Sequence, residues 1–273
     1  MRIITLVEDT PGNSGCGYEH GLSFYVETEK HKLLVDSGAT DMFLRNAQML
    51  GIDLKQVDTC ILSHGHYDHG GGLRAFSAEN PKAAIYMRAS AGGEYYHLKD
   101  EGEKYIGIDK DVTELPQVVA VDHDLRIDGE LFLFSDIAGR KYPSRGNREL
   151  RRREGDSFVQ DTFDHEQCLV ITQGSTNVLI SGCAHNGIIN ILDRYEDIFH
   201  SMPDIVVSGF HLAQKTAYVE EDVKNIEDIA GALKKTGAVF YTGHCTGQEA
   251  YKIMKPVMGE LLRPLHSGEE ILG

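Results

Sequence analysis

The sequence predicts an α/β (α+β) fold in which a mixed sheet, or two packed sheets, carries helices on the outside. Two observations predict it. The first third of the chain contains β-branched runs arranged as a hairpin, and the last third alternates apolar strands with helices. No strong internal repeat, low-complexity tract or linker interrupts the 273 residues. We therefore expect a single domain over 1–273.

In the first third, strands are expected over 2–8, 22–28 and 31–38, which are β-branched runs bounded by Gly, Asp and Asn. Only Glu29 and Lys30 separate the second run from the third, which indicates a hairpin. The stretch 41–52 has helical spacing with one apolar face. The short apolar run 58–63 is typical of a buried strand, and it ends directly before His64.

The segment 92–165 is expected to be an irregular insertion around the core. Residues 92–108 are polar and aromatic, and residues 140–156 contain seven Arg or Lys side chains together with Pro and Gly. A loop of this length without elements of its own is uncommon unless it is functional or disordered. We expect this segment to shape the pocket.

In the last third, strands are expected over 167–172, 177–182, 204–209 and 238–243. Helices are expected between them, over 187–200, 220–235 and 247–258. This alternation is the pattern of strands that are linked by helices on the outside of a sheet.

Composition excludes several classes of protein. The 27 basic and 42 acidic residues give a net charge of −15, which argues against nucleic acid or an anionic membrane as the main partner. No run approaches the ~20 apolar residues of a membrane span. The first residues lack the apolar core of a signal peptide, and the five widely spaced cysteines fit a reducing compartment. We expect a cytoplasmic protein, and the sequence leaves a homo-oligomer open.

The segment from Ser63 to Gly72 carries the strongest chemical signal. It places four metal-competent side chains within six residues, in a glycine-rich turn after a buried strand: His64, His66, Asp68 and His69. Imidazole and carboxylate at this density favour zinc, with iron or manganese as alternatives. His64 and His66 project to the same side of an extended segment, whereas Asp68 and His69 lie past a bend, where a second ion could bind.

Three further histidines follow strand ends in the C-terminal half: His185, His211 and His244. Each comes after an apolar strand that ends with a small residue or Gly. Loops that leave the same end of a sheet converge in space, so we expect at least two of the three to be metal ligands. For any one of them alone, a hydrogen-bonded structural histidine is the simpler interpretation.

The motif HGHYDHGGGL resembles the HxHxDH signature of the metallo-β-lactamase superfamily. The later motifs VLISGCAHNGIIN, SGFHL and YTGHCTG resemble a branch named for an archaeal synthase of methanopterin biosynthesis. The superfamily implies an αββα sandwich with a dinuclear site at one edge, and it places Asp36 behind the metals. It implies that one ion binds His64, His66 and His185, and that the other binds Asp68, His69 and His244. Asp68 is also the expected catalytic residue, which orients the nucleophile or accepts its proton.

One position departs from the superfamily pattern. Most hydrolases of the superfamily carry a bridging Asp after a late strand, whereas here Cys183 follows VLISG. Three alternatives follow for the missing bridging ligand. Cys183 supplies a thiolate in its place, His211 takes its place, or the second ion binds weakly. A buried, small, apolar role for Cys183 beside the site is at least as consistent with the sequence.

Other residues are candidates for contact with the substrate. The basic segment includes Arg145 and Arg148, which could bind a phosphate or carboxylate, although a solvated surface segment explains the same charges. His20 precedes a strand on the side where the superfamily's site lies, and it is a further candidate for substrate contact.

These observations predict a metal-dependent hydrolase that acts on a small anionic ester or phosphoester with a metal-bound hydroxide. The alternative from the branch resemblance is a synthase that joins a dihydropterin diphosphate to ribofuranosylaminobenzene phosphate. A non-catalytic metal or ligand sensor is a further alternative, although Asp68 argues against it. A diiron oxidoreductase is disfavoured, because that group typically carries Glu at the position of His66.

Overall fold

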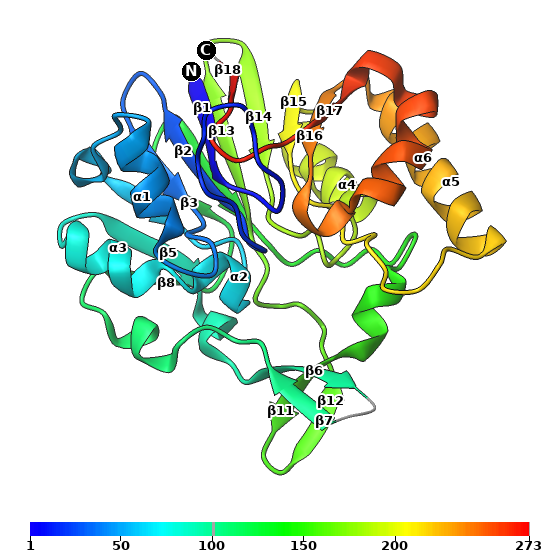
Figure 1. The fold of residues 1–273 in the computed structure, drawn as a ribbon, viewed down its shortest axis with the longest axis horizontal. Coiled ribbons are helices and arrows are strands. Elements are labelled where there is room, and N and C mark those ends of the chain that lie inside the picture. Colours follow the sequence, from blue (N-terminus) through cyan, green and yellow to red (C-terminus); the bar gives the residue numbers. More distant parts are fainter. Residues whose placement is uncertain (100–101, 273) are drawn as a thin grey trace.

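The chain folds into a four-layer αββα sandwich in a computed structural model that describes residues 1–99 and 102–272. Two mixed sheets pack face to face, and helices cover their outer faces (Figure 1). The predicted fold class is therefore confirmed. No helix among these residues combines the length and the apolar character that crossing a bilayer requires.

The N-terminal sheet is antiparallel over its first three pairings and parallel over the rest. Its strands, in spatial order, are β18 (Glu270–Leu272), β1 (Arg2–Val7), β2 (Ser23–Glu27), β3 (Lys32–Val35), β4 (Thr59–Ile61), β5 (Ala84–Arg88) and β8 (Val118–Val121). The hairpin expected between the second and third runs is formed by β2 and β3, with Val26 opposite Leu33.

The C-terminal sheet has a similar plan, with parallel pairing from β14 to β17 and antiparallel pairing elsewhere. Its strands, in spatial order, are β17 (Leu262–Pro264), β16 (Val239–Thr242), β15 (Ile205–Val207), β14 (Thr176–Ile180), β13 (Cys168–Gln173), β10 (Leu131–Phe134) and β9 (Leu125–Arg126). The four strands predicted in the last third of the chain correspond to β13, β14, β15 and β16.

Helices cover the two outer faces (Figure 1). The N-terminal sheet is covered by α1 (Met42–Met49) and α3 (Leu73–Glu79), and the C-terminal sheet by α4 (Ile188–Phe199), α5 (Glu220–Thr236) and α6 (Gln248–Met258). The short α2 (Tyr67–Gly70) lies within the histidine motif. Single 3₁₀ turns occur at 54–56, 89–92, 110–114, 145–149, 244–246 and 259–261.

The segment 92–165 is more regular than the sequence indicated. Within it, β8 is the edge strand of the N-terminal sheet, and β10 is an inner strand of the C-terminal sheet. A separate antiparallel sheet consists of β12 (Ser157–Gln160), β11 (Leu150–Glu154), β6 (Tyr95–Lys99) and β7 (Gly102–Tyr105), and it projects from one end of the sandwich (Figure 1). This small sheet buries few apolar residues, with Tyr95 and Leu150 among them, so the hydrophobic periodicity that reveals a strand is weak here.

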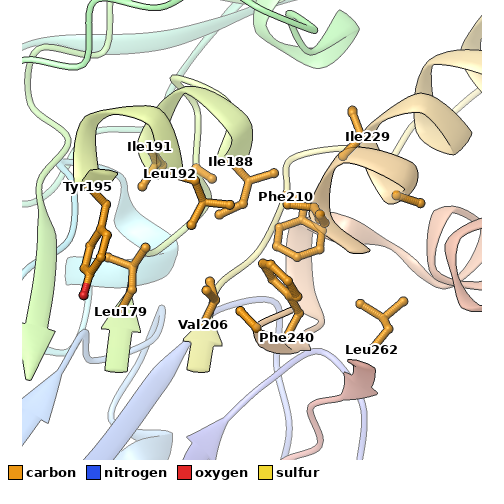
Figure 2. Packing of buried hydrophobic residues seen from close by; sticks show 14 of the residues in the cluster. Leu179, Ile188, Ile191, Leu192, Tyr195, Val206, Phe210, Ile229, Phe240 and Leu262 are labelled. Carbon is orange, nitrogen blue, oxygen red and sulfur yellow. The ribbon is translucent and has the colours of Figure 1, made fainter. Parts of the chain in front are cut away.

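The C-terminal sheet and its helices share one apolar core. Phe240 of β16 is fully buried, and it packs with Val206 of β15 and with Phe210, against residues of α4 and α5 (Figure 2). This core holds β14, β15 and β16 in register with their helices. The loops that leave these strands therefore begin from fixed positions.

We expect Phe240→Ala to lower the free energy of unfolding by about 3–5 kcal/mol, because it removes a large side chain from a closed core. Urea unfolding followed by circular dichroism measures this change. Val219→Ala, at a side chain that is 53% exposed, is the matched control and should change stability by about 0.5 kcal/mol or less. Equal effects of the two substitutions would contradict this account of the core.

An ion-paired histidine connects the two sheets. His31 Nδ1 lies 2.8 Å from Asp58 Oδ1, next to β4, and its Nε2 lies 2.7 Å from Asp128 Oδ2, in the turn between β9 and β10. Burial opposes the charged imidazole, but the hydrogen bonds to Asp128 and Asp58 outweigh burial and raise the pKa of His31. His31 is therefore more easily protonated in the folded chain than in the unfolded chain.

Because its pKa is raised on folding, the stabilisation from His31 should be complete below about pH 6.5 and should fade as the pH rises through the folded pKa. We expect His31→Gln to cost about 1 kcal/mol at pH 6, after allowance for partial exposure, and less at pH 9. Thermal unfolding at both pH values measures the difference, with the exposed His123→Gln as the control. A cost that grows from pH 6 to pH 9 would overturn this interpretation.

Candidate metal centre

The candidate site lies where strands from both sheets end. His64 follows β4, Cys183 and His185 follow β14, and His211 and His244 follow β15 and β16. In sheets with parallel strands, sites form at the carboxyl ends of the strands, where the loops converge. The two sheets bring these ends to one edge of the sandwich, so His64 and His185, 121 positions apart, and His69 and His244, 175 positions apart, become neighbours.

The three residues expected to hold the first ion lie around a common point. The ring centroid of His66 lies 4.6 Å from that of His64 and 4.8 Å from that of His185. The Nε2 atoms of His64 and His185 are 3.3 Å apart. All three side chains are buried. The structure therefore brings the three rings together, although the ligand atoms grouped within 4.8 Å of one another are those of His64, Cys183 and His185, and His66 is grouped with Asp161 and His165.

The three residues expected to hold the second ion converge beside the first set. His69 Nε2 lies 3.2 Å from His244 Nε2, and His244 Nε2 lies 3.4 Å from Asp68 Oδ2. Asp68 also contacts His20, whose Nε2 lies 3.3 Å from the same carboxylate oxygen. His244 thus contacts both other members of the second predicted set, whereas the ligand atoms grouped within 4.8 Å of one another are those of His69, His244 and Cys183. His20 lies at the edge of this set.

Cys183 lies between the two sets rather than behind them. Its sulfur is 3.1 Å from His69 Nε2. It belongs to one group of potential ligand atoms with His64 and His185 and to another with His69 and His244, and the atoms within each group lie within 4.8 Å of one another. The sequence left open whether Cys183 supplies a thiolate or is a small buried residue beside the site, and the geometry puts its sulfur among the potential ligand atoms.

Hydrogen bonds fix the tautomers of the buried histidines. His69 Nδ1 donates to Asp36 Oδ2 at 2.6 Å, and His244 Nδ1 donates to Asp9 Oδ1 at 2.6 Å. His185 Nδ1 donates to Asn147 Oδ1 at 3.1 Å. Because the acceptor is a carboxylate or an amide oxygen, the Nδ1 proton stays on each ring and the Nε2 lone pair is left free.

Ser63 holds the Nδ1 proton of His64 in the same way. The Ser63 hydroxyl donates its proton to Asp36 Oδ2 at 2.7 Å, so it can only accept from His64 Nδ1, which lies 2.9 Å away. Asp36 also accepts the Ser63 backbone N–H at 2.7 Å. Asp36 thus orients both His64 and His69 from behind the ligand atoms, where the superfamily resemblance placed it.

This arrangement fits metal ions. The Nε2 atoms of His69 and His244 lie 3.2 Å apart and those of His64 and His185 lie 3.3 Å apart, and two lone pairs at these distances repel unless a proton or a metal ion lies between the rings. Burial opposes the charged form of His244, but hydrogen bonds to Asp68 and Asp9 outweigh burial and raise its pKa, so its surroundings favour such a cation. His66 Nε2 is buried and has no hydrogen-bond partner among the described residues. Nitrogen, carboxylate and thiolate donors in this mixture suit zinc, and iron and manganese are compatible with the nitrogen and oxygen donors.

Burial and charge set the protonation of the site. Burial, together with neighbouring histidines, lowers the pKa of His66 to about 3 and holds the pKa values of His64 and His185 well below their usual range. These rings are therefore neutral, as metal ligands must be. In contrast, hydrogen bonds to Asp68 and Asp9 raise the pKa of His20 to about 9.

Several supporting residues were missed from the sequence. Asp9 bridges His20 and His244, and Glu8 accepts the His244 backbone N–H at 2.5 Å. Glu166 accepts the backbone N–H of His185 at 2.6 Å. A weak signal for Asp9 and Glu8 existed, because the pair follows directly after an apolar strand, as the predicted ligands do. Glu166 lies next to another missed residue, His165.

His165 supports the turn that carries the first ligands. The Gly65 N–H donates to His165 Nδ1 at 3.0 Å, and His165 Nε2 contacts Asp161 at 3.2 Å. A side chain at Gly65 would place its Cβ 2.2 Å from the carbonyl oxygen of Ala91, so only glycine fits between His64 and His66. The close approach of backbone to backbone fixes the path of this motif.

A cavity of about 560 Å³ opens onto both ligand sets. The predicted contact residues His20, His211 and Arg145 line it, and so do three lysines that the sequence analysis did not single out: Lys99, Lys104 and Lys215. Arg148 does not line this cavity; it lies along two neighbouring hollows. Of the basic segment, only Arg145 therefore faces the site, and it pairs with Asp222 at 3.1 Å.

We expect Asp36→Asn to weaken metal binding by about 10- to 100-fold, because the amide cannot accept all the donors that orient His64 and His69. Asn also tolerates the left-handed backbone at this position (φ 58°). Competition with a chromophoric chelator measures the affinity. Asp58→Asn, at a carboxylate paired with His31 outside the centre, is the control. An affinity for Asp36→Asn within twofold of wild type would contradict the proposed orientation.

Comparison with known proteins agrees with this geometry. The chain is 29% identical to the 7,8-dihydropterin-6-methyl-4-(β-D-ribofuranosyl)-aminobenzene-5'-phosphate synthase of Methanocaldococcus jannaschii, over 99% of this chain and 96% of that protein. A crystal structure described as a metal-dependent hydrolase of the β-lactamase superfamily superposes with a TM-score of 0.84 at 31% identity, covering 100% of this chain and 99% of the other.

A more distant structure shares the fold. Zinc-bound PqqB from Methylobacterium extorquens gives a TM-score of 0.56 at 11% identity, with 100% of both chains covered. The profile of the metallo-beta-lactamase superfamily matches residues 16–206, which is more than half of the chain. With the αββα fold and the converging ligand sets, this match shows that the chain belongs to the metallo-beta-lactamase superfamily.

Proposed function

We propose that this protein is a zinc-dependent hydrolase of a small anionic ester or phosphoester. The observation that carries the proposal is the convergence of two ligand sets and the carboxylate of Asp68 on the lining of one cavity. His64, His66 and His185 would hold one ion, and Asp68, His69 and His244 would hold the other, with Cys183 between them. A bound zinc ion lowers the pKa of water to about 7 and polarises the electrophile.

The residues of the chain then have separable tasks. Asp68 lines the cavity, where it can orient the attacking water and accept its proton. His20, hydrogen-bonded to Asp68 and Asp9, is placed to stabilise negative charge on the substrate. Asp9 keeps both His20 and His244 in position.

The charge around the cavity supports an anionic substrate. Lys99, Lys104, Lys215 and Arg145 line it, although the chain carries a net charge of −15. Asp9, Asp68 and Glu149 also line the cavity. Cations that line a cleft raise the local concentration of an anion and speed its binding. The cavity volume of about 560 Å³ lies within the range of small-molecule sites.

A second candidate is the transfer of a pterin group, in which a diphosphate would leave. The similarity to the archaeal synthase along nearly the whole of both chains favours it. The same cations would bind the leaving diphosphate, and the same ligand sets would hold the metals. Incubation with a dihydropterin diphosphate and ribofuranosylaminobenzene phosphate, followed by mass spectrometry, separates condensation from hydrolysis.

For the hydrolase, we expect the zinc-loaded protein to cleave bis(p-nitrophenyl) phosphate, and Asp68→Ala to reduce the rate at least about 100-fold. Release of p-nitrophenol measures turnover, and elemental analysis of each variant shows whether the metal is retained. Asp41→Asn, at an exposed carboxylate, is the control. Unchanged turnover in Asp68→Ala would refute the role of Asp68. Ligand binding without turnover on a broad panel would favour the sensor.

A further inference from the structure

We propose a third metal site, rich in sulfur, formed by Cys183, His211 and Cys245. It would take a soft or borderline ion such as Zn²⁺, Co²⁺ or Cd²⁺. The proposal does not depend on the hydrolase function. It concerns two residues, His211 and Cys245, that belong to neither of the two ligand sets described above.

The three side chains already have the spacing of a metal site. One potential ligand atom from each lies within 4.8 Å of the other two. With zinc–sulfur bonds of about 2.3 Å and zinc–nitrogen bonds of about 2.0 Å, tetrahedral ligands stand about 3.5–3.8 Å apart. The cluster therefore needs only side-chain rotations to close around an ion. Both cysteines are buried free thiols.

His211 has a buried ring nitrogen without a hydrogen-bond partner. Its Nδ1 atom is buried and has no hydrogen-bond partner among the residues that the structure describes. The backbone of His211 is left-handed (φ 48°), and its carbonyl oxygen accepts a hydrogen bond from Ser144 at 2.5 Å. A buried nitrogen without a partner is an atom that a bound ion would satisfy.

The local backbone makes room for the Cys245 sulfur. A Cβ atom at Gly209 would lie 2.5 Å from that sulfur, so the glycine before Phe210 leaves the space the thiol occupies. The His211 backbone N–H donates to the same sulfur at 3.3 Å. The sulfur in turn lies 3.6 Å from the carbonyl oxygen of Cys183. Three strand ends thus hold this thiol beside Cys183.

The donor set distinguishes this site from its neighbours. Two sulfurs and one nitrogen favour soft or borderline ions, whereas the other two sets are dominated by nitrogen and oxygen. Cys183 would be shared with those sets. Three protein ligands leave a fourth position open, and all three residues line the cavity. An anionic oxygen of the substrate is the kind of ligand that an open zinc position accepts.

Cobalt titration tests the proposal directly. The metal-free protein, kept reduced and free of oxygen, is titrated with Co²⁺, and the thiolate-to-cobalt charge-transfer band in the near ultraviolet is recorded. Bound cobalt is counted by elemental analysis after gel filtration. We expect wild type to bind one ion more than Cys245→Ser, with a weaker charge-transfer band in the variant. Cys16→Ser, at a buried cysteine that does not line the cavity, should match wild type.

A second variant controls for the possibility that Cys245→Ser loses the ion because it misfolds. His211→Gln keeps both thiols and should also lose one ion, while circular dichroism shows whether each variant retains the native fold. Unchanged stoichiometry in Cys245→Ser and His211→Gln would overturn the proposal. So would a weaker band with an unchanged ion count, because Cys245 would then be a ligand of one of the other two ions. Loss of phosphodiesterase activity has no bearing on this test.

Discussion

The metal centre depends on hydrogen bonds that hold the Nδ1 protons of four histidines in place and turn their Nε2 atoms toward one another: His64, His69, His185 and His244. Asp36 is the main anchor, because it accepts from His69, from the Ser63 hydroxyl and from the Ser63 backbone N–H. Asp9 does the same for His244. Without these acceptors the imidazoles could rotate or change tautomer, and the facing lone pairs would no longer define positions for ions.

The sandwich brings these residues together because both sheets end their parallel strands at one edge. His64 follows β4, and Cys183, His211 and His244 follow β14, β15 and β16. The apolar cores on the two faces of the C-terminal sheet hold those strands in place. The ligand residues follow directly from the strands, so their positions are fixed as well. The third sheet and the basic residues around it add the wall of the cavity, in which cations attract an anionic substrate.

Much of this arrangement could be predicted from the sequence, because the signals were local or periodic. Strand–helix alternation predicted the C-terminal half, and the density of ligands in HGHYDH predicted a metal site. Glu166 and His165 could not be predicted, since each is a single polar residue on a segment that only the tertiary fold brings to the site. Asp9 had only the weak signal of its place directly after an apolar strand. The small sheet within 92–165 was missed because it buries few apolar side chains. The position of Cys183 required the relative placement of both halves.

The central claim is that two distinct ligand sets hold two ions, and metal content tests it most directly. Zinc per chain is measured by elemental analysis for wild type, His185→Ala, His244→Ala and the double variant. The account predicts that each single variant holds one ion fewer than wild type and that the double variant holds two fewer. Loss of all metal from both single variants, or of none from either, would contradict two separate sites.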